Sequence, residues 1–276
     1  MDKVGGMAVN ILEQLAEHAR ERVAEAKRRI PPEEMKAKAF AIAAAERQTA
    51  TAAEFTFPFE RALRGERMAF ICECKKASPS KGLIAPDFPY LEIAKSYEAA
   101  GAQAISVLTE PKWFLGSDQY LKEIADAVKI PCLRKDFTVD EYMIYEAKTL
   151  GAAAVLLICA LLDTETLRRY IRICDSLGLS ALVEAHDEAE VRSAVDAGAR
   201  IIGVNNRNLK DFTVDFSNSI RLRSLIPVDV IFVAESGVRT RADVELLRAH
   251  KVDAALIGET LMRAPDRRAM LEALRG

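Results

Sequence analysis

The sequence has little of what disulfide-bonded, zinc-binding and membrane-embedded proteins require. Its 276 residues include five cysteines, with no C-x-x-C pair, and only three histidines. Neither a disulfide framework nor a zinc site is therefore expected. No apolar run approaches the roughly 20 residues that span a bilayer, and the charged N-terminal segment lacks the hydrophobic region of a signal peptide. We expect a protein of the reducing cytoplasm.

An excess of charge of one sign is also missing. The chain has 39 Lys and Arg against 41 Asp and Glu, a formal net charge of -2. This balance disfavours a nucleic-acid footprint or a polybasic membrane anchor. The glycine-rich fingerprint G-x-G-x-x-G of dinucleotide-binding folds is absent too. We expect a protein that acts on a small molecule, with no nucleic-acid, membrane or obligate protein partner.

The first 65 residues differ from the rest. Apolar residues recur at helical spacing from 11 to 29 among charges, and Pro31 and Pro32 end that pattern. A second charged, alanine-rich stretch runs to about residue 53, and an aromatic segment at 55–59 follows it. The first convincing strand begins at Ala69. The sequence thus predicts a helical extension over 1–65, packed on a domain that occupies 66–276.

From residue 69 onward, short apolar runs alternate with helical stretches. Gly101, Gly151 and Gly198 each precede such a run, as glycines do where a helix ends before a strand. We predict strands near 69–75, 104–109, 131–135, 153–158, 181–184, 201–205, 230–235 and 254–257. Eight buried strands that alternate with helices favour an α/β fold, a closed (β/α)8 TIM barrel, over an open doubly wound sheet.

Charged and polar residues end several of these strands, where the active site of such a barrel is built. Side chains two apart on a strand share a face, so Glu73 and Lys75 point one way and Cys72 and Cys74 the other. The same alternation directs four more polar side chains inward: Lys135, Glu184, Asn205 and Glu235. A single strand-end charge is often only a solvated terminus, whereas several that converge can supply both acid and base.

A phosphate site is indicated after the last two predicted strands. Ser236 and Gly237 follow the seventh, and Gly258, Glu259 and Thr260 follow the eighth. Small residues there can expose backbone N–H groups beside a helix N-terminus, which is the usual phosphate position in this fold. Glu259 brings a like charge toward the dianion, so we expect its side chain to point away, the backbone to bind, and Thr260 to supply a hydroxyl.

The strand ends, taken in order, resemble those of indole-3-glycerol-phosphate synthases. The matching segments are ECKKASPSKG, LTEPKWFLGS, LRKDF, LLI, LVEAH, GVNNRNL, AESGV and LIGETLMR. The N-terminal helices and the segment at 59–63 also resemble that family's extension, which covers the barrel and contributes to substrate binding. The resemblance implies a carboxy-lyase of tryptophan biosynthesis. It would close the ring of 1-(2-carboxyphenylamino)-1-deoxyribulose 5-phosphate with loss of carbon dioxide and water, without a metal or organic cofactor.

The resemblance also implies roles for individual residues. Lys135 would be a general acid, Glu184 a proton-transfer carboxylate in dehydration, and Glu73 a partner that tunes the lysines. Lys75 would bind substrate and share the acid role. Asn205, which belongs to the same catalytic set, and Arg207 would bind the hydroxyl chain or the substrate carboxylate. The remaining substrate contacts would be Ser78, Phe114, Phe137, Leu156, Leu209, Glu235 and Leu256. The phosphate would lie against Ser236, Gly237, Gly258, Glu259 and Thr260.

Two alternatives stay open at this point. A phosphoribosylanthranilate isomerase-like barrel would share the fold and phosphate site, but its cysteine-plus-aspartate chemistry fits poorly, because the first-strand cysteines have the wrong parity. A non-catalytic barrel that binds phosphorylated metabolites is the other alternative. Metal chemistry is not expected, since His18, His186 and His250 are scattered. We place His18 on the polar side of its helix and His186 in a loop beside the site.

Overall fold

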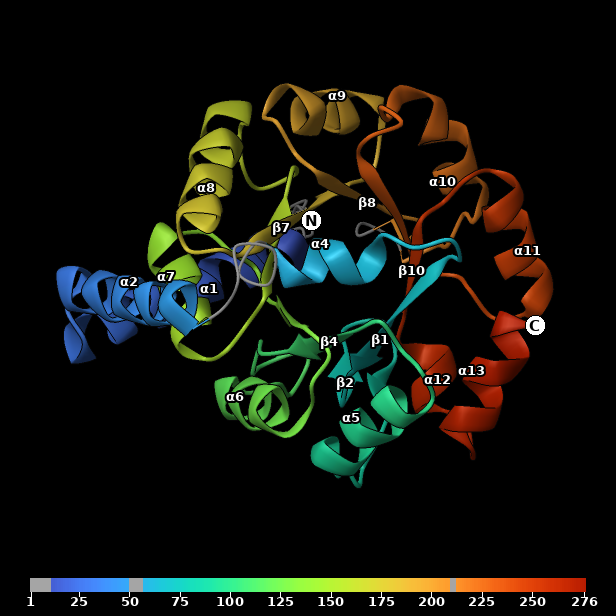
Figure 1. Cartoon of the computed structure of the whole chain (residues 1–276), viewed down its shortest axis with the longest axis horizontal. Coiled ribbons are helices and arrows are strands. Elements are labelled where there is room, and N and C mark those ends of the chain that lie inside the picture. The colour runs from blue at the N-terminus through green and yellow to red at the C-terminus, as the bar shows by residue number, and fades with distance from the viewer. Residues whose placement is uncertain (1–10, 50–56, 209–211) are drawn as a thin grey trace, which may run out of the picture.

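Eight parallel strands form a closed barrel surrounded by helices (Figure 1). The computed structural model describes residues 11–49, 57–208 and 212–276. Around the barrel the strands follow the order β1-β10-β9-β8-β7-β6-β5-β4. They are β1 (Ala69–Cys74), β4 (Ala104–Leu108), β5 (Cys132–Lys135), β6 (Ala154–Ile158), β7 (Ser180–Ala185), β8 (Ile201–Asn205), β9 (Ile231–Glu235) and β10 (Ala254–Ile257). The predicted (β/α)8 barrel is confirmed.

Helices connect the strands and form the outer ring. They are α5 (Tyr90–Ala99), α6 (Asp118–Ala127), α7 (Glu141–Thr149), α8 (Thr164–Ser176), α9 (Glu188–Asp196), α10 (Ser217–Leu222) with the 3-10 turn η1 (Arg223–Leu225), α11 (Arg241–Ala249), α12 (Glu259–Met262) and α13 (Arg267–Arg275). A short antiparallel pair, β2 (Ala77–Ser78) and β3 (Gly82–Leu83), follows β1. At the predicted helix-to-strand turns, φ is +79° at Gly101 and +83° at Gly151, the left-handed conformation that glycine adopts without strain.

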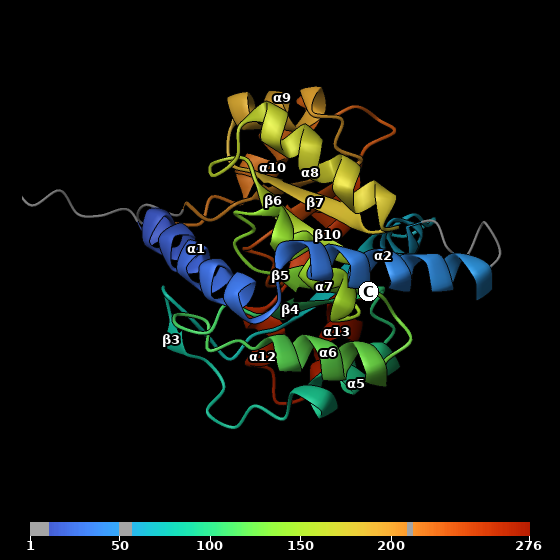
Figure 2. The same cartoon turned by 90° about the vertical axis from the view of Figure 1, so that its left-hand side faces the viewer.

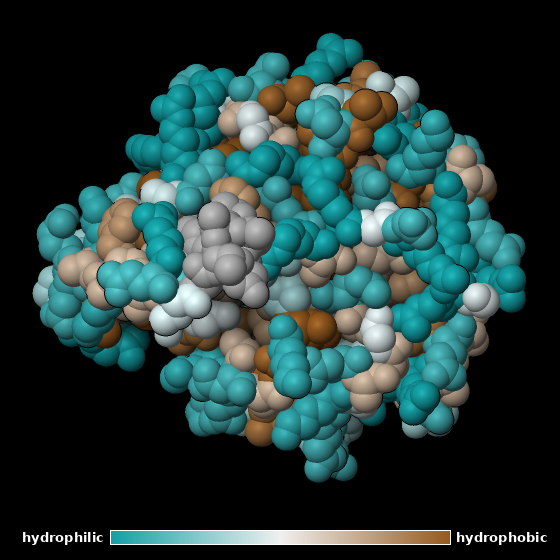
Figure 3. All heavy atoms as spheres, viewed as in Figure 1, coloured by the Kyte–Doolittle hydropathy of each residue, from teal (hydrophilic) through white to brown (hydrophobic). Residues whose placement is uncertain are grey.

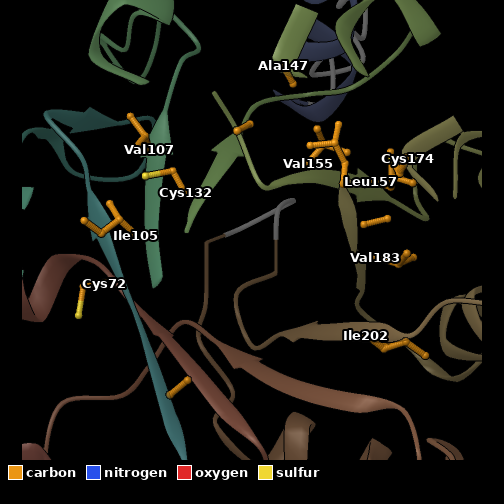
Figure 4. Close-up of a cluster of buried hydrophobic side chains, with 14 of the residues drawn as sticks. Cys72, Ile105, Val107, Cys132, Ala147, Val155, Leu157, Cys174, Val183 and Ile202 are labelled. Atoms are coloured by element: carbon orange, nitrogen blue, oxygen red, sulfur yellow. The ribbon is translucent and has the colours of Figure 1, made fainter. Parts of the chain in front are cut away.

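Two apolar layers separate according to strand alternation. Ile71, Leu133 and Leu182 fill the inside of the barrel, whereas Cys72 and Cys74 face the surrounding helices. Figure 4 shows part of this outer layer, with Cys72, Ile105, Val107, Cys132, Ala147, Val155, Leu157, Cys174, Val183 and Ile202. The parity expected for the first strand is therefore confirmed: its cysteines pack against helices and its Glu73 belongs to the interior face.

Of the three N-terminal helices, the first and third lie at opposite ends of the barrel, and the second packs against α7 of the outer ring. The three are α1 (Ile11–Arg29), α2 (Pro32–Thr49) and α4 (Pro58–Leu63). In Figure 2, α1 lies at one end, and α4 crosses the other end, which faces the viewer in Figure 1. There Glu60 accepts hydrogen bonds from Arg200, just before β8, and from Ser180 at the start of β7. Thus α4 closes the barrel where the strands begin.

The outer face of the molecule is mixed in character. On the face of Figure 3, hydrophobic residues lie in separate small groups among hydrophilic ones. Across the described ranges, no helix combines the length and the apolar character that crossing a bilayer would require. The apolar residues of the chain are instead used mainly in the two layers around the barrel wall.

Candidate active site

A cavity of about 410 Å³ opens where the barrel strands end. Ile11, Leu12 and Leu15 of α1 form part of its wall, so α1 covers the mouth of the barrel. The segment at 59–63 does not line this cavity, because α4 lies at the other end. The predicted site residues that line it are Glu73, Lys75, Ser78, Phe114, Lys135, Phe137, Leu156, Glu184, Asn205, Arg207, Glu235, Ser236, Gly237, Leu256, Gly258, Glu259 and Thr260. Leu209 lies outside the described residues.

Three carboxylates and two lysines converge at the bottom of the cavity. Lys75 Nζ lies 2.6 Å from Glu73 Oε1, and both residues come from the end of β1. Lys135 Nζ, at the end of β5, lies 3.3 Å from Glu184 Oε2 and 3.6 Å from Glu235 Oε2. The three carboxylates are buried. The strand ends therefore bring together a compact group that can hold and move protons.

Burial and charge oppose each other in this group. Burial alone would lower the pKa of Lys135, but Glu184, Glu235 and Glu73 outweigh it and raise that pKa. For Glu73, burial raises the pKa, and the charges of Lys75 and Lys135 reverse this and bring it below the usual value. Lys135 also helps to lower the pKa of Glu184 against burial. Lys135 is therefore held as an ammonium ion by the carboxylates around it.

Glu235 behaves differently from the other two carboxylates. Burial and the nearby charge of Glu184 raise its pKa to about 8, and Lys135 offsets this only in part. Glu235 Oε1 is shielded from solvent and has no hydrogen-bond partner within the described chain, which makes its charged form costly. Glu235 is thus protonated near neutral pH, next to carboxylates that are ionised.

Two glycines make room for these carboxylates. A Cβ at Gly203, on the neighbouring strand β8, would overlap Glu235 Oε1. A Cβ at Gly258 would overlap Glu73 Oε1 and lie 2.9 Å from Lys75 Nζ. Gly258 was predicted from its position after the last strand to lie at the phosphate. The structure shows in addition that it lets the first-strand pair approach the last strand.

The loops that follow β9 and β10 lie beside this cluster. Ser236 and Gly237 both have positive φ, +66° and +91°, and Gly258 precedes α12. The Glu259 carboxylate accepts a hydrogen bond from Arg263 Nε at 3.1 Å, and Lys81 Nζ lies 3.7 Å away. Its negative charge is therefore offset by neighbouring cations.

The Thr260 hydroxyl was expected to bind the phosphate, but in the structure it is engaged elsewhere. Its Oγ1 donates to the Val238 carbonyl at 2.8 Å. Phosphate oxygens need donors, and this one is already used within the loop. Arg207, Arg239 and Arg263 also line the cavity, and their side chains can supply donors instead.

Two aromatic rings form an apolar wall of the cavity. The rings of Phe114 and Phe137 lie 6.0 Å apart between centroids, at 42°. The loop that carries Phe114 is organised by buried Glu110, whose carboxylate accepts from the backbone N–H groups of Trp113 and Phe114 at 2.8 and 3.1 Å. Glu110 was not among the predicted residues, although its position directly after a strand is the signal that could have found it.

Helix α1 is tied to the barrel by polar contacts that were also not predicted. His18 Nδ1 lies 3.0 Å from Glu110 Oε1, so the placement of His18 on the polar side of its helix was wrong. His18 is one residue from buried Ala19, at the edge of the apolar stripe. Arg22 donates to both oxygens of Asp136 at 2.7 and 3.1 Å. Asp136 is buried between Lys135 and Phe137, so this pair links α1 to the site.

Metal binding has no support in the side-chain arrangement. Within the described ranges, no group of three or more His, Cys, Asp and Glu is arranged so that it could hold a metal ion. Two of the three buried carboxylates of the site, Glu73 and Glu184, each lie beside the ammonium group of a lysine. The positive charges beside these carboxylates therefore come from lysines of the chain itself.

Comparisons with known proteins identify the family of this chain. The family described as indole-3-glycerol phosphate synthase matches residues 12–274. A protein of that name from Ruminiclostridium cellulolyticum is 66% identical over 220 residues, which cover 80% of this chain and 85% of that protein. Another from Lachnoclostridium phytofermentans is 49% identical over 267 residues, 96% of this chain and 98% of that protein.

Solved structures support the fold at lower identity. The structure of 3-hexulose-6-phosphate synthase from Salmonella typhimurium matches with a TM-score of 0.62 at 16% identity, covering 75% of this chain and 97% of that one. That likeness shows the barrel alone. The sequence match over nearly the whole chain is what distinguishes this barrel from an isomerase or a non-catalytic relative. The chain therefore belongs to the indole-3-glycerol phosphate synthase family and is a carboxy-lyase of that kind.

Proposed function

We propose that the buried cluster performs the proton transfers of indole ring closure on 1-(2-carboxyphenylamino)-1-deoxyribulose 5-phosphate. The observation that carries this proposal is the position of Lys135, whose ammonium group lies within 3.6 Å of two buried carboxylates at the cavity floor. An ammonium held there can donate to the ketone oxygen as the new carbon–carbon bond forms. Lys135 is therefore the general acid of this step.

The other members of the cluster divide the remaining tasks. Glu184 moves protons in the dehydration step, and Asn205, whose Nδ2 lies 3.3 Å from Glu184 Oε1, orients it and binds the hydroxyl chain. The hydrogen bond from Lys75 to Glu73 keeps Lys75 directed at the substrate, where it shares the acid role. Glu235, protonated near neutral pH, donates a hydrogen bond to the substrate.

The two ends of the substrate take different walls of the cavity. The anthranilate ring lies against Phe114, Phe137, Leu156 and Leu256, with Leu209 assigned to the same wall from the sequence alone. This apolar wall favours decarboxylation, because it disfavours the charged carboxylate relative to neutral carbon dioxide. The phosphate lies beside the loops after β9 and β10 and the side chain of Arg207. The backbone that binds it belongs to Ser236, Gly237, Gly258, Glu259 and Thr260. Ser78 contacts the same anionic substrate from the β1 side.

We also propose that residues 1–65 act as a substrate-covering extension and residues 66–276 as the catalytic barrel. Ile11, Leu12 and Leu15 of α1 line the cavity, whereas α4 closes the opposite end. The extension therefore has two tasks. Helix α1 forms part of the wall at the mouth of the cavity, and α4 closes the opposite end of the barrel, where the strands begin.

The activity is tested with purified, chelator-treated protein and the carboxyphenylamino-deoxyribulose phosphate, following the fluorescence of the indole product. Lys135→Ala should lower kcat by about 10² to 10⁴, the usual effect of losing a general acid. Lys129→Ala, an exposed lysine just before β5, is the control and should leave kcat unchanged. Lack of product with the wild-type protein would contradict the activity, and a rate for Lys135→Ala within a few-fold of wild type would contradict the acid assignment.

A further inference from the structure

His186 lies between two carboxylates, directly after β7. Its Nε2 lies 3.4 Å from Glu184 Oε1, and its Nδ1 lies 3.1 Å from Glu190 Oε2 on α9. The same Glu190 oxygen accepts the backbone N–H of His186 at 2.7 Å. Asn218 of α10 donates to the His186 carbonyl at 3.0 Å. Glu190 and Asn218 therefore fix the position of the residue, and Nδ1 is anchored on Glu190 while Nε2 lies on the side of Glu184.

These contacts fix where the protons of the ring lie. An ionised carboxylate only accepts hydrogen bonds, so Nδ1 must carry the hydrogen that faces Glu190. In the neutral ring, Nε2 would then present a lone pair to Glu184 Oε1, and two acceptors would face each other. A proton between Nε2 and Oε1 removes this conflict. Nε2 is shielded from solvent and has no hydrogen-bond partner within the described chain, and a proton carried there would face Glu184 Oε1 at 3.4 Å.

The surrounding charges favour this imidazolium. Burial lowers the pKa of His186, but the hydrogen bond to Glu190 and the charges of Glu184, Glu190 and Glu235 raise it above its usual value. His186 in turn helps Lys135 to lower the pKa of Glu184. The Cys159 thiol, which donates to the Glu190 backbone carbonyl at 3.5 Å, is neutral because burial raises its pKa to about 12.

The proposed reaction creates a demand for one proton. The substrate carboxylate leaves as neutral carbon dioxide, so its negative charge is lost. The ketone oxygen takes one proton and the resulting hydroxyl takes a second to leave as water, while one C–H proton is released. Each turnover therefore takes up one proton from solvent. The carboxylates of the site are buried, Glu184 with 2% of its surface exposed, so this proton needs a path.

We propose that His186 supplies this proton to the site through Glu184. In the step, the Nε2–H bond breaks and a Glu184 Oε1–H bond forms, leaving a neutral imidazole. Glu184 then gives the proton to the departing hydroxyl and returns to its ionised form. The side chain keeps 19% exposure, and the ring regains its proton from water between turnovers when Nε2, which is shielded in this structure, comes into contact with solvent. His186 acts through Glu184 and does not touch substrate, and this inference rests on the proposed ring-closing function.

The test compares His186→Gln with wild type in single-turnover reactions, with enzyme in excess, from pH 6 to 9. Glutamine keeps an amide that can bond to either carboxylate but cannot carry a proton across. We expect the rate at pH 7 to fall about 10- to 100-fold, less than the loss of about 10² to 10⁴ that follows removal of a group donating directly to substrate, because His186 acts through Glu184. His250→Gln is the matched control, because His250 is exposed and its Nδ1 lies 2.9 Å from the Leu246 carbonyl oxygen one turn earlier in the chain. It should leave the rate unchanged.

The pH profile separates proton relay from simple positioning. In the wild type, the rate should fall as pH rises through the raised pKa of His186, above 6.5, and this fall should be absent in His186→Gln. Glu190→Gln keeps an acceptor for Nδ1 but removes the charge that favours the imidazolium. Its profile should therefore shift to lower pH, with the rate at pH 6 retained. Since Glu235 also titrates in this range, the two variants assign the fall to His186.

Three results would overturn the proposal. One is a His186→Gln rate within two-fold of wild type at every pH. Another is a uniform loss that leaves the wild-type pH dependence in place, which would mean that His186 only positions Glu184. The third is an unshifted profile in Glu190→Gln. If the wild-type protein forms no indole product at all, the proposed function fails instead, so the two failures are distinguishable.

Discussion

Replacing Glu235 with glutamine tests the charge state of the site through protein stability. Burial and Glu184 raise the pKa of Glu235 from its usual 4.5 to about 8. Between these values the native state holds the proton and the unfolded chain has released it. The unfolded state then binds fewer protons, so the free energy of unfolding falls as pH rises through this window. Glutamine does not titrate, so Glu235→Gln lacks this contribution.

The magnitude follows from the two pKa values. A group fully protonated in one state and ionised in the other changes stability by about 1.36 kcal/mol per pH unit. From pH 5.5 to 7.5, Glu235 should therefore cost the wild type about 2.5 kcal/mol that the variant does not lose. Other titrating groups affect both proteins alike, so the difference between the two curves isolates Glu235. The sign is specific, because a carboxyl with a lowered pKa would add no such loss.

The assay is denaturant unfolding of both proteins at pH 5.5, 6.5 and 7.5, followed by circular dichroism. Glu188→Gln serves as control, since Glu188 on α9 has a side chain 54% exposed. Its stability should follow the wild-type curve. Parallel curves for wild type and Glu235→Gln would refute the reasoning, because they would mean that Glu235 ionises in the native state as readily as in the unfolded chain.

The other predictions concern the site and its extension. Arg22→Met removes the bidentate partner of Asp136 and should lower the free energy of unfolding, measured in urea, by about 2 to 4 kcal/mol. The loss is smaller than for a fully buried pair, because the Arg22 side chain is 22% exposed. Gly203→Ala should displace Glu235, lower kcat at least about ten-fold and destabilise the barrel by about 1 to 3 kcal/mol. Deleting residues 1–49 should raise the KM for the substrate strongly and lower the Tm of the protein only slightly. The barrel keeps its strands but loses the part of the cavity wall that α1 forms.

Each of these has an outcome that contradicts it. Arg29→Met, which alters an arginine that is 70% exposed on the same helix, is the control for Arg22→Met, and equal effects of the two would argue against the Asp136 pair. Unchanged kinetics in Gly203→Ala would mean that Glu235 has free space elsewhere. A truncated protein with the wild-type KM would make α1 a purely structural element.

The strands and their faces could be predicted because their signals are local. Buried parallel strands read as continuous apolar runs, and period-two alternation alone separates Glu73 from Cys72. Eight strand ends must meet at one rim of a closed barrel, so the predicted residues within the described chain all line one cavity. The resemblance to the family added their roles, which the spacing did not contain.

The contacts of α1 with the barrel could not be predicted from local sequence patterns. Arg22 and Asp136 are 114 positions apart, and a surface arginine on an amphipathic helix looks the same whether it meets water or a buried carboxylate. His18 fails for the same reason, since its place at the edge of an apolar stripe fits either environment. The protonation of Glu235 also escapes the sequence, because it depends on distances to Glu184 and Lys135 that only the closed barrel sets.

The neutral state of Glu235 has a consequence for binding an anion. With Glu235 protonated, each of the remaining carboxylates of the cavity floor, Glu73 and Glu184, lies beside a lysine, Lys75 and Lys135. Ionising Glu235 would add a buried negative charge beneath a substrate that itself carries a carboxylate and a phosphate, and would repel it. Substrate affinity should therefore weaken as pH rises past about 8. A KM that stays constant from pH 6 to 9.5 in the wild type would contradict this argument, and Glu235→Gln should show no rise in KM at high pH.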